Sequence, residues 1–520
     1  MFSSLVHIAR LLRAGRTLAR YDVLLQSGQF KDLPPTVRFC IRVARLGTRS
    51  PQADPESRLT EALASLGPSY IKLGQFLATR PDIIGPARAF ELKALQDRLP
   101  PFDMEQARAI IQGNLGGKIS DHFSELSPPV AAASVAQVHR GVTVDGETVA
   151  VKVLRPGVEG RFAADLQSFY FVARLIERFS AEGRRLRPVA AVAMLEESMR
   201  IELDLRMEAS AISEMQENIR LDPGFVVPRI DWRRTARQIL TTGWIDGTPI
   251  SDVEALRAKG FDAKALGDTV IQSFLRHAIR DGFFHADMHP GNLFVDNSGK
   301  IVAVDFGITG RLGEKERSFL AEILFGFITR DYMRVSLVHF QAGYVPADQD
   351  PATFAQALRA IGEPIMDRAA NEISMARLLT QLFEVTAQFN MSTQPQLLLL
   401  QKTMVVVEGV ARTLNPDLNM WVSAEPVVRG WIERRLGPVG KVETGTLVLS
   451  RLVMGLPSML DDAHRATALL ASMAQSGGLR LDPQTIKDLA REKAGTRRLI
   501  HMALGAGITA LMIIAYALIR

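Results

Sequence analysis

The sequence predicts an α+β fold with two lobes, preceded by a helical extension and followed by one membrane-spanning helix. Three observations lead to this prediction. Residues 148–154 show the alternation of an apolar strand that carries one lysine, and residues 293–304 show the pattern of a hairpin with polar residues at its ends. Helical patterns dominate after residue 307. Residues 499–519 contain no Asp, Glu, Lys or Arg.

The composition is that of a globular protein. The 520 residues are 47% hydrophobic and 23% charged, which indicates packed units and no wholesale disorder. The net charge of +6 is too diffuse to indicate nucleic-acid binding, and we expect no nucleic-acid partner. Cys40 is the only cysteine, which excludes an internal disulfide and a multi-cysteine zinc site.

The N-terminal region, residues 1–50, begins with a predicted basic amphipathic helix. Residues 2–21 lack acidic side chains, and their arginines fall on one helical arc while leucines and an isoleucine fall on another. Such a helix could lie on an anionic membrane surface, act as an organelle transit peptide, or cover the folded body with its apolar stripe. The sequence leaves these three alternatives open.

A helical extension is predicted over residues 51–118. After the breaker at residues 51–55, apolar residues recur at three-to-four spacing from Leu59 to Leu77. Lys72 and Gln75 share one face of this helical pattern, so two polar heads point together from an apolar segment. Taken alone, the two side chains would be interpreted as solvated surface residues.

The strand-rich lobe is predicted over residues 119–245. It contains an alanine-rich stretch, which consists of Ala131, Ala132, Ala133 and Ser134. A kinase carries a glycine-rich loop at this position, and alanine restricts positive φ, so we expect phosphate contacts and nucleotide preference to differ from those of an ordinary kinase. Lys152 follows in a Val-Ala-Val-Lys strand and is expected to sit on the nucleotide phosphates.

Residues 189–218 are predicted to form one long helix. It contains Glu202 and Asp204 in a Glu-Leu-Asp sequence and, one turn later, Glu208. In a kinase architecture one helical glutamate pairs with the strand lysine, and Glu208 is the candidate for that partner. A strand at residues 238–243 then runs into a turn, where we expect the hinge between the lobes.

The chemistry is concentrated around the predicted hairpin. Asp287 lies five residues ahead of Asn292, and Asp305 opens an Asp-Phe-Gly sequence, in the order and spacing of the protein-kinase catalytic loop and metal motif. Asn292 and Asp305 would supply the hard oxygen ligands that Mg²⁺ prefers, and Asp287 would position the nucleophile. His285 and His289 can be read as histidines that only satisfy the loop.

The helical lobe is predicted over residues 246–440, with helical patterns at residues 319–329, 354–361, 378–389 and 397–414. A helical stem at residues 441–498 leads to residues 499–519, which as a helix would span roughly 31 Å, about the hydrocarbon core of a bilayer. A buried core helix is the alternative. Basic residues precede this segment, so the positive-inside rule places the large domain on the cytoplasmic face. Small residues four apart in the tail would allow helix pairing and a homodimer.

The ordered motifs resemble those of the UbiB family of atypical kinase-like proteins of ubiquinone biosynthesis. The motifs are Lys72-x-Gly-Gln75, the alanine-rich stretch, the Lys152 strand, Glu202-x-Asp204, His-Ala-Asp287-x-His-Pro-Gly-Asn292 and Asp305-Phe-Gly. The resemblance covers roughly residues 60–320. It implies a protein-kinase-like fold in which the extension folds over the active site. It also gives Lys72, Gln75, Glu202 and Asp204 a joint regulatory role.

The resemblance further implies ATP and Mg²⁺ as cofactors, with ATPase or small-molecule or lipid kinase activity in support of ubiquinone synthesis. The implied partners are membrane lipid, isoprenoid or polyprenyl-phenol precursors of ubiquinone, and other proteins of that synthesis. The implied location is the bacterial inner membrane, with the mitochondrial inner membrane as the alternative. Ala286 stands where protein kinases carry an arginine and no Ala-Pro-Glu motif follows, which argues against peptide substrates.

Two other functions remain open from the sequence. One is a phosphotransferase similar to aminoglycoside or choline kinases, which also use a His-x-Asp loop with an Asn five residues later. The Lys-x-Gly-Gln segment and the apolar tail argue against it. The other is a nucleotide-gated lipid-binding or scaffold protein without obligatory phosphotransfer.

Overall fold

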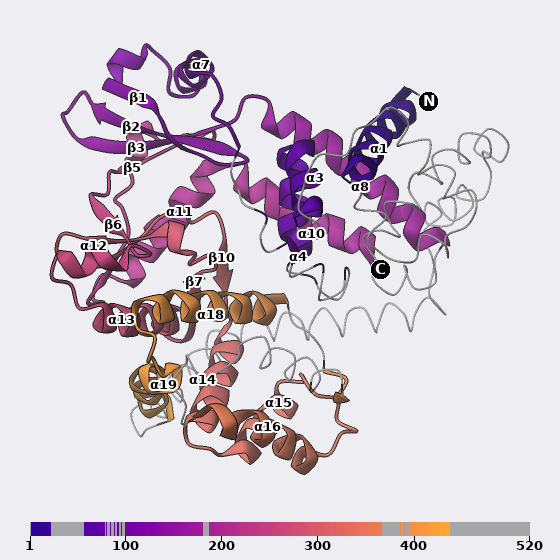
Figure 1. The fold of residues 1–520 in the computed structure, drawn as a ribbon, viewed down its shortest axis with the longest axis vertical. Coiled ribbons are helices and arrows are strands. Elements are labelled where there is room, and N and C mark those ends of the chain that lie inside the picture. Colours follow the sequence, from indigo (N-terminus) through magenta and orange to yellow (C-terminus); the bar gives the residue numbers. More distant parts are fainter. Residues whose placement is uncertain are drawn as a thin grey trace, which may run out of the picture. The chain divides into compact units, whose positions relative to one another are not determined.

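The computed structural model describes residues 2–21, 57–78, 99–179, 187–366 and 395–436, with residues 80, 84, 88, 91, 92, 95, 385 and 388–391 in addition. One compact unit includes Met1–Val427, and a second begins at Val428. The elements described below belong to the first unit, apart from the end of the last helix. Figure 1 shows their order along the chain.

The N-terminal helix α1 (Phe2–Arg20) lies on the folded body. It packs against α3 (Arg58–Leu66) and α8 (Val158–Phe179). Its apolar stripe is buried, with Leu11, Ala14, Leu18 and Ala19 at most 6% exposed. Of the three alternatives that the sequence leaves open, the structure shows the one in which the apolar stripe covers the folded body.

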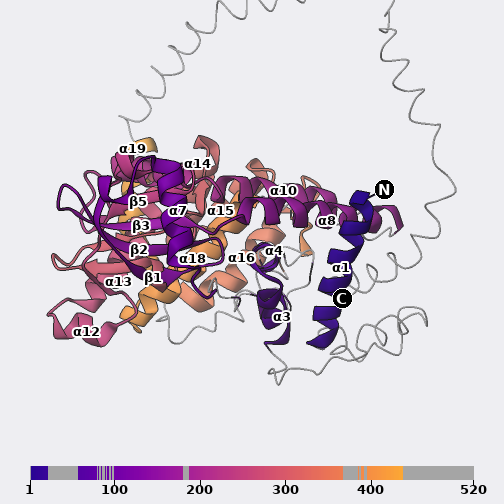
Figure 2. The same cartoon turned by 90° about the horizontal axis from the view of Figure 1, so that it is seen from above.

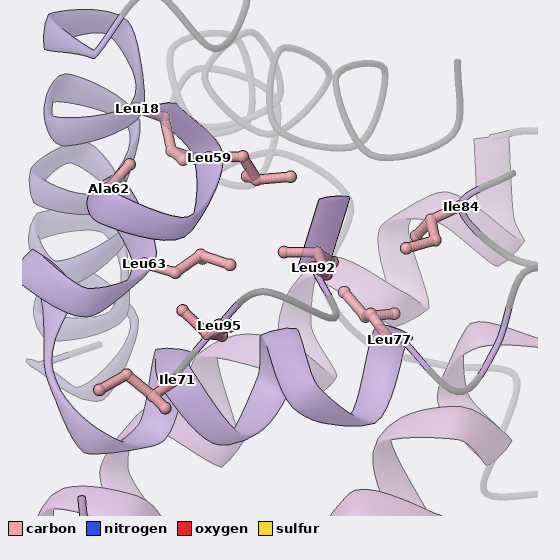
Figure 3. Packing of buried hydrophobic residues seen from close by; sticks show 9 residues of the cluster. All are labelled: Leu18, Leu59, Ala62, Leu63, Ile71, Leu77, Ile84, Leu92 and Leu95. Carbon is pink, nitrogen blue, oxygen red and sulfur yellow. The ribbon is translucent and has the colours of Figure 1, made fainter. Parts of the chain in front are cut away.

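The extension consists of two helices rather than one continuous run. Helix α3 ends at Leu66, and α4 (Pro68–Ala78) begins two residues later. Gly67 separates them with a φ of +104°, a backbone conformation that favours glycine, and proline suits the first turn of the next helix. Figure 3 shows their common core, in which Leu92 and Leu95 lie between the leucines of α3 and the side chains of Ile71 and Leu77 on α4.

The strand-rich lobe is one antiparallel sheet in the order β1-β2-β3-β5. Its strands are β1 (Phe123–Ala132), β2 (Ala136–Thr143), β3 (Thr148–Leu154) and β5 (Ile239–Gly243). Helix α7 (Met104–Leu115) lies beside this sheet in both views (Figure 1, Figure 2). Its Ile111 is buried with Val149, Val151 and Val153, which alternate with Lys152 along β3. The alternation leaves Lys152 on the other face of the sheet.

The long helix predicted over residues 189–218 is wrong, because the structure has two helices there. Helix α10 (Pro188–Glu202) ends before Leu203, and α11 (Leu205–Asn218) follows. Asp204 caps α11, since its side chain accepts a hydrogen bond from the Arg206 backbone N–H. The Leu205 N–H leaves the helical ladder and donates to the carbonyl of Arg237 at 2.9 Å.

The predicted hairpin is present as β8 (Leu293–Asp296) and β9 (Ile301–Ala303), which pair antiparallel. A second sheet forms around it in the order β4-β9-β8-β6, with β4 (Phe225–Val226) and β6 (Gly247–Pro249) at its edges. Two further strands, β7 (Phe283–His285) and β10 (Thr309–Arg311), pair with each other. Asp287 and Asn292 lie between β7 and β8, and Asp305 lies between β9 and β10.

Helices make up the rest of the second lobe. They are α12 (Val253–Ala258), α13 (Ala263–Leu275), α14 (Glu314–Ile328), α15 (Tyr332–Gln341), α16 (Pro351–Met366), α18 (Pro395–Leu414) and α19 (Met420–Leu436). A π-helical turn (Arg276–Asp281) joins α13 to the segment before β7. The helices predicted near residues 319–329, 354–361 and 397–414 correspond to α14, α16 and α18. The predicted helix at residues 378–389 lies mostly outside the described residues.

No helix in the described part of the chain has the length and apolar character needed to cross a membrane. The predicted stem and the predicted span at residues 499–519 lie outside the described residues.

Candidate functional site

The centre of the candidate site is a lysine between two carboxylates. Lys152 Nζ, on β3, donates to both carboxylate oxygens of Glu208 on α11, at 2.9 Å each. The same ammonium group lies 3.1 Å from Asp305 Oδ1. Glu208 is buried, whereas the Asp305 side chain is 47% exposed. The structure thus brings three of the predicted site residues together from three separate segments.

The charges of this group shift its pKa values in different directions. Burial raises the pKa of Glu208 to about 7, against the opposing effect of Lys152. Desolvation would also raise the pKa of Asp305, but Lys152 outweighs it and, with a contribution from Lys72, holds that pKa at about 2. Burial would lower the pKa of Lys152, yet the two carboxylates raise it above its ordinary value. Lys152 is therefore a cation and Asp305 an anion at neutral pH.

Asp287 and Asn292 are held together in the loop after β7. Asn292 Nδ2 donates to the main-chain carbonyl of Asp287 at 3.0 Å and lies 3.4 Å from its carboxylate. The Asn292 amide oxygen is thereby left for another partner. Pro290–Asn292 forms one 3-10 turn, and the His289 ring accepts a hydrogen bond from the Gly291 N–H at its start. His289 therefore satisfies the loop, as one interpretation of the sequence held.

His285 fixes this loop through hydrogen bonds of both ring nitrogens. The ring is fully buried, and Nδ1 accepts a hydrogen bond from the Asp287 N–H at 3.0 Å. Nε2 must then carry the proton, and it donates to the Val304 carbonyl at 3.1 Å. Burial lowers the pKa of His285, which keeps the ring neutral and suits both hydrogen bonds. One imidazole thus links the main chain of Asp287 to that of Val304, the residue before Asp305.

A second support comes from α18, a helix to which the sequence assigned no role. The buried Thr403 hydroxyl lies 3.0 Å from the carbonyl of Ala286 and 2.8 Å from the carbonyl of Leu399 in its own helix. Ala286 precedes Asp287, so Thr403 braces the loop from 117 residues away in the chain. No local sequence pattern could have indicated this contact.

The alanine-rich stretch closes the turn between β1 and β2. Ala131 and Ala132 end β1, and the Ala133 N–H donates to the Ala136 carbonyl at 2.8 Å. None of these alanines has a positive φ, which agrees with the conformational limit of alanine. The buried Ser134 lies within this turn, next to the end of the strand that carries Lys152.

The four predicted regulatory residues are only partly brought together. Lys72 of α4 forms an ion pair with Glu202, the last residue of α10. Lys72 also lowers the pKa of Asp305, which places it near the lysine and carboxylates described above. The Gln75 amide makes no hydrogen bond to any described residue.

The structure pairs Lys72 with Glu202 and gives Asp204 other contacts. Asp204 instead caps α11 and pairs with Arg206, whose Nη2 lies 2.7 Å from its Oδ2. The physical reason is the helix break at Leu203, which turns Asp204 toward the free backbone N–H groups of the next helix.

These side chains fit a nucleotide bound with Mg²⁺. Asp305 Oδ1 contacts Lys152 and the Gly307 N–H, while the other carboxylate oxygen and the Asn292 amide oxygen have no partner among the described residues. These are hard oxygen donors. No group of three or more His, Cys, Asp or Glu gathers as a metal cage within the described ranges. A metal held by few protein ligands together with phosphates is the usual arrangement for Mg²⁺.

Comparison with known proteins agrees with this geometry. Residues 94–339 match the ABC1 atypical kinase-like domain, and residues 358–419 match the UbiB helical domain. A probable protein kinase UbiB from Marinobacter nauticus is 41% identical over 474 residues, which cover 90% of this chain and 85% of the relative. The chain belongs to the UbiB family. The predicted resemblance is thereby confirmed.

Other relatives extend over similar lengths. Proteins of the same description from Pseudomonas fluorescens and Azotobacter vinelandii are 40% and 39% identical, and they cover 91% and 92% of this chain and 88% and 94% of their own lengths. Among solved structures, the complex of Rv3197 with erythromycin from Mycobacterium tuberculosis matches with a TM-score of 0.52 at 23% identity, over 71% of this chain and 94% of that chain. This likeness supports the kinase-like fold with mixed helices and strands. The family name implies a role connected with ubiquinone.

Proposed function

We propose that this chain is a membrane-associated, ATP-dependent enzyme of ubiquinone synthesis that transfers the phosphoryl group of ATP to water or to a small acceptor. The observation that carries the proposal is the position of Lys152, which contacts the helix carboxylate of Glu208 and the motif carboxylate of Asp305 at the same time. This arrangement presents one cation and one anion beside the oxygen donors of the loop.

The residues have separate roles in this proposal. Asn292 and Asp305 would hold Mg²⁺, and Lys152, oriented by Glu208, would neutralise phosphate charge. The alanine-rich turn at Ala131–Ser134 would lie over the phosphates. Bound MgATP supplies the transferable phosphoryl group and the metal charge that stabilises its transfer. Asp287, held by Asn292 and His285, would orient the attacking hydroxyl or water and accept its proton.

Substitution of Asp305 tests the nucleotide site. MgATP should raise the melting temperature of the wild-type protein, and Asp305→Asn should abolish that shift because it removes a metal-binding charge. The matched control is Asp348→Asn, an exposed aspartate in the loop after α15. Equal shifts in wild type and Asp305→Asn would contradict the assignment.

The membrane association is proposed from the sequence and from the exposed side of α1. Arg13 and Arg16 are exposed on this helix, opposite its buried apolar stripe, and would face anionic lipid. Deletion of residues 499–520 should release the protein from the bacterial inner membrane into the soluble fraction. If the deleted protein still sediments with membranes, the anchor lies elsewhere in the chain or in a partner.

Catalysis and its lipid dependence need a separate measurement. We expect slow phosphate release in solution and faster release with anionic liposomes or polyprenyl-phenol compounds, because lipid would act on the extension that carries Lys72. Turnover that is equal with and without liposomes would remove the lipid gating. No turnover under any of these conditions, with MgATP binding intact, would favour a nucleotide-gated binding or scaffold protein.

A further inference from the structure

Arg155 connects the alanine-rich turn to a segment of the extension. It follows β3 directly, three residues after Lys152. Its Nε donates to the Ala133 carbonyl at 2.9 Å, and its Nη2 donates to the Pro100 carbonyl at 2.8 Å. Its backbone N–H donates to the Val135 carbonyl, also at 2.8 Å. One residue thus holds both sides of the turn and reaches the chain before α7.

A buried glutamine makes the same connection a second time. Gln137 on β2 is completely buried, and its Oε1 accepts a hydrogen bond from the Phe102 N–H at 2.9 Å. Its Nε2 lies 3.3 Å from the Phe102 carbonyl and 3.0 Å from His139 Nε2. His139 Nδ1 donates in turn to the Ser127 carbonyl at 2.9 Å. The side chain of Gln137 therefore pairs with the main chain of Phe102 as a neighbouring strand would.

These contacts leave the turn little freedom of its own. The Ala133 N–H is used within the turn, and its carbonyl is used by Arg155. The Phe102 ring lies 5.7 Å from the Arg155 guanidinium carbon, so the planar group is also held from the side. Any displacement of residues 99–102 would break their hydrogen bonds to Arg155 and Gln137 unless these residues, and the turn that Arg155 holds, moved with them.

We propose that Arg155 is a positioning residue that ties the alanine-rich turn to residues 99–102, so that the turn and the end of the extension move as one unit. The proposal rests on the proposed nucleotide site and adds how that site is regulated. Residues 99–102 lie between α4, which carries Lys72, and α7. A change in the position of the extension would then reach the phosphate-covering turn through two side chains, Arg155 and Gln137.

The first test removes the forked guanidinium of Arg155 but keeps its positive charge. Arg155→Lys should weaken MgATP binding by about tenfold, because a single ammonium nitrogen cannot reproduce the planar fork in which separate guanidinium nitrogens reach the Ala133 and Pro100 carbonyls. The matched control is Arg161→Lys, since Arg161 is exposed and donates to the single carbonyl of Pro156 at 3.2 Å. Unchanged MgATP affinity in Arg155→Lys would overturn the proposal.

A second measurement does not depend on nucleotide. Hydrogen–deuterium exchange of the free protein should increase in residues 99–103 and 131–136 together in Arg155→Lys and in Gln137→Leu, and in neither segment in Arg161→Lys. An increase confined to one segment, or no increase, would overturn the common movement. This result stands even if wild type fails to bind MgATP, so failure of the proposed function and failure of this inference can be told apart.

The connection to the extension is tested by a double-mutant cycle. If Arg155 transmits the position of the extension, the effects of Lys72→Ala and Arg155→Lys on MgATP affinity should not multiply, and the double variant should differ at least about threefold from the product of the single effects. Purely multiplicative effects would overturn this coupling.

Discussion

Lys72 and Glu202 form an ion pair that is largely withdrawn from water, with side-chain exposures of 9% and 14%. The pair joins α4 of the extension to the end of α10, two residues before the cap of the helix that carries Glu208. Glu202 raises the pKa of Glu208, although less than burial does, and Lys72 lowers the pKa of Asp305. The charge of Lys72 on the extension therefore contributes to the electrostatics of the candidate site.

We expect Lys72→Ala to lower the free energy of unfolding by about 3 kcal/mol, because the largely buried Glu202 carboxylate loses the ammonium group that it contacts. The double variant Lys72→Met with Glu202→Leu should lose much less, since it removes both charges of the pair. Urea unfolding of both variants checks this expectation. Equal losses in the single and double variants would show that the pair contributes packing rather than charge.

Arg311→Ala should weaken MgATP binding several-fold while changing stability by less than about 1 kcal/mol. Arg311 on β10 donates to both carboxylate oxygens of Glu214 on α11, at 2.7 and 2.5 Å. The pair is 66% and 37% exposed, so it adds little stability, but it holds the Glu208 helix to the strand after Asp305.

A matched pair controls for the loss of an exposed bidentate ion pair. Arg229 contacts both oxygens of Glu147 at 3.1 and 2.9 Å, away from α11. Arg229→Ala should leave MgATP affinity unchanged. The charge exchange Arg311→Glu with Glu214→Arg should restore much of the lost affinity, and a failure to restore it would argue against positioning through this contact.

His277 predicts a pH dependence of stability. The ring is fully buried in the π-helical turn, and neither nitrogen has a hydrogen-bond partner among the described residues. Burial lowers its pKa from 6.5 to about 3. Below about pH 6.5 the unfolded chain therefore binds a proton that the folded protein does not. Stability should fall as the pH drops from about 6.5 to about 3, by up to about 1.4 kcal/mol per pH unit from this group.

His277→Phe should reduce that slope, because phenylalanine takes up no proton and can pack beside Phe225, whose ring lies 4.8 Å from the imidazole. The measurement is urea unfolding of both proteins at several pH values. Acidic groups away from the ring contribute equally to both curves, so the difference reports His277 together with Asp222, whose pKa His277 lowers. Parallel curves would contradict the assignment.

Thr403→Val should lower stability by about 1–2 kcal/mol, because the Ala286 carbonyl loses its buried hydrogen bond. It should also slow phosphate release at saturating MgATP, since Ala286 adjoins Asp287. Thr413→Val is the control, because Thr413 donates only within its own helix, to the Gly409 carbonyl at 3.0 Å. Equal turnover in the two variants would show that the loop does not need the brace.

The local patterns of the sequence predicted β3, β5, β8 and β9, whereas they did not predict β1, β2 and the short strands β4, β6, β7 and β10. Strand β3 has the predicted bounds, and the hairpin of β8 and β9 follows from apolar runs around an Asp-Asn-Ser-Gly turn. Helix ends were harder, because Asp204 in a charged helical pattern can be a surface residue or a cap. In the structure Asp204 is a cap, and the Leu205 N–H donates to the Arg237 carbonyl of a distant segment instead of continuing the hydrogen bonds of α10. The break of the extension at Gly67 has a different cause, the positive φ of that glycine.

The supports of the candidate site could not be predicted from spacing. Lys152 and Asp305 were identified because their motifs are local and ordered, and Glu208 because a kinase architecture pairs one helical glutamate with the strand lysine. Thr403 and Arg155 act on carbonyl groups, and every residue offers one, so no residue type marks the acceptor. Such contacts depend on how distant segments pack, which periodicity does not contain.

The backbone of Asp305 affects how an inactive variant should be made. Asp305 has a φ of +60°, a left-handed conformation that costs most L-residues about 1–2 kcal/mol and that asparagine tolerates better than alanine. Replacement by alanine would remove the carboxylate and also favour a different path of the chain through the Asp-Phe-Gly sequence. Loss of function in that variant would then have two inseparable causes. Asparagine removes the charge and preserves the local geometry, so it is the cleaner knockout for genetic complementation.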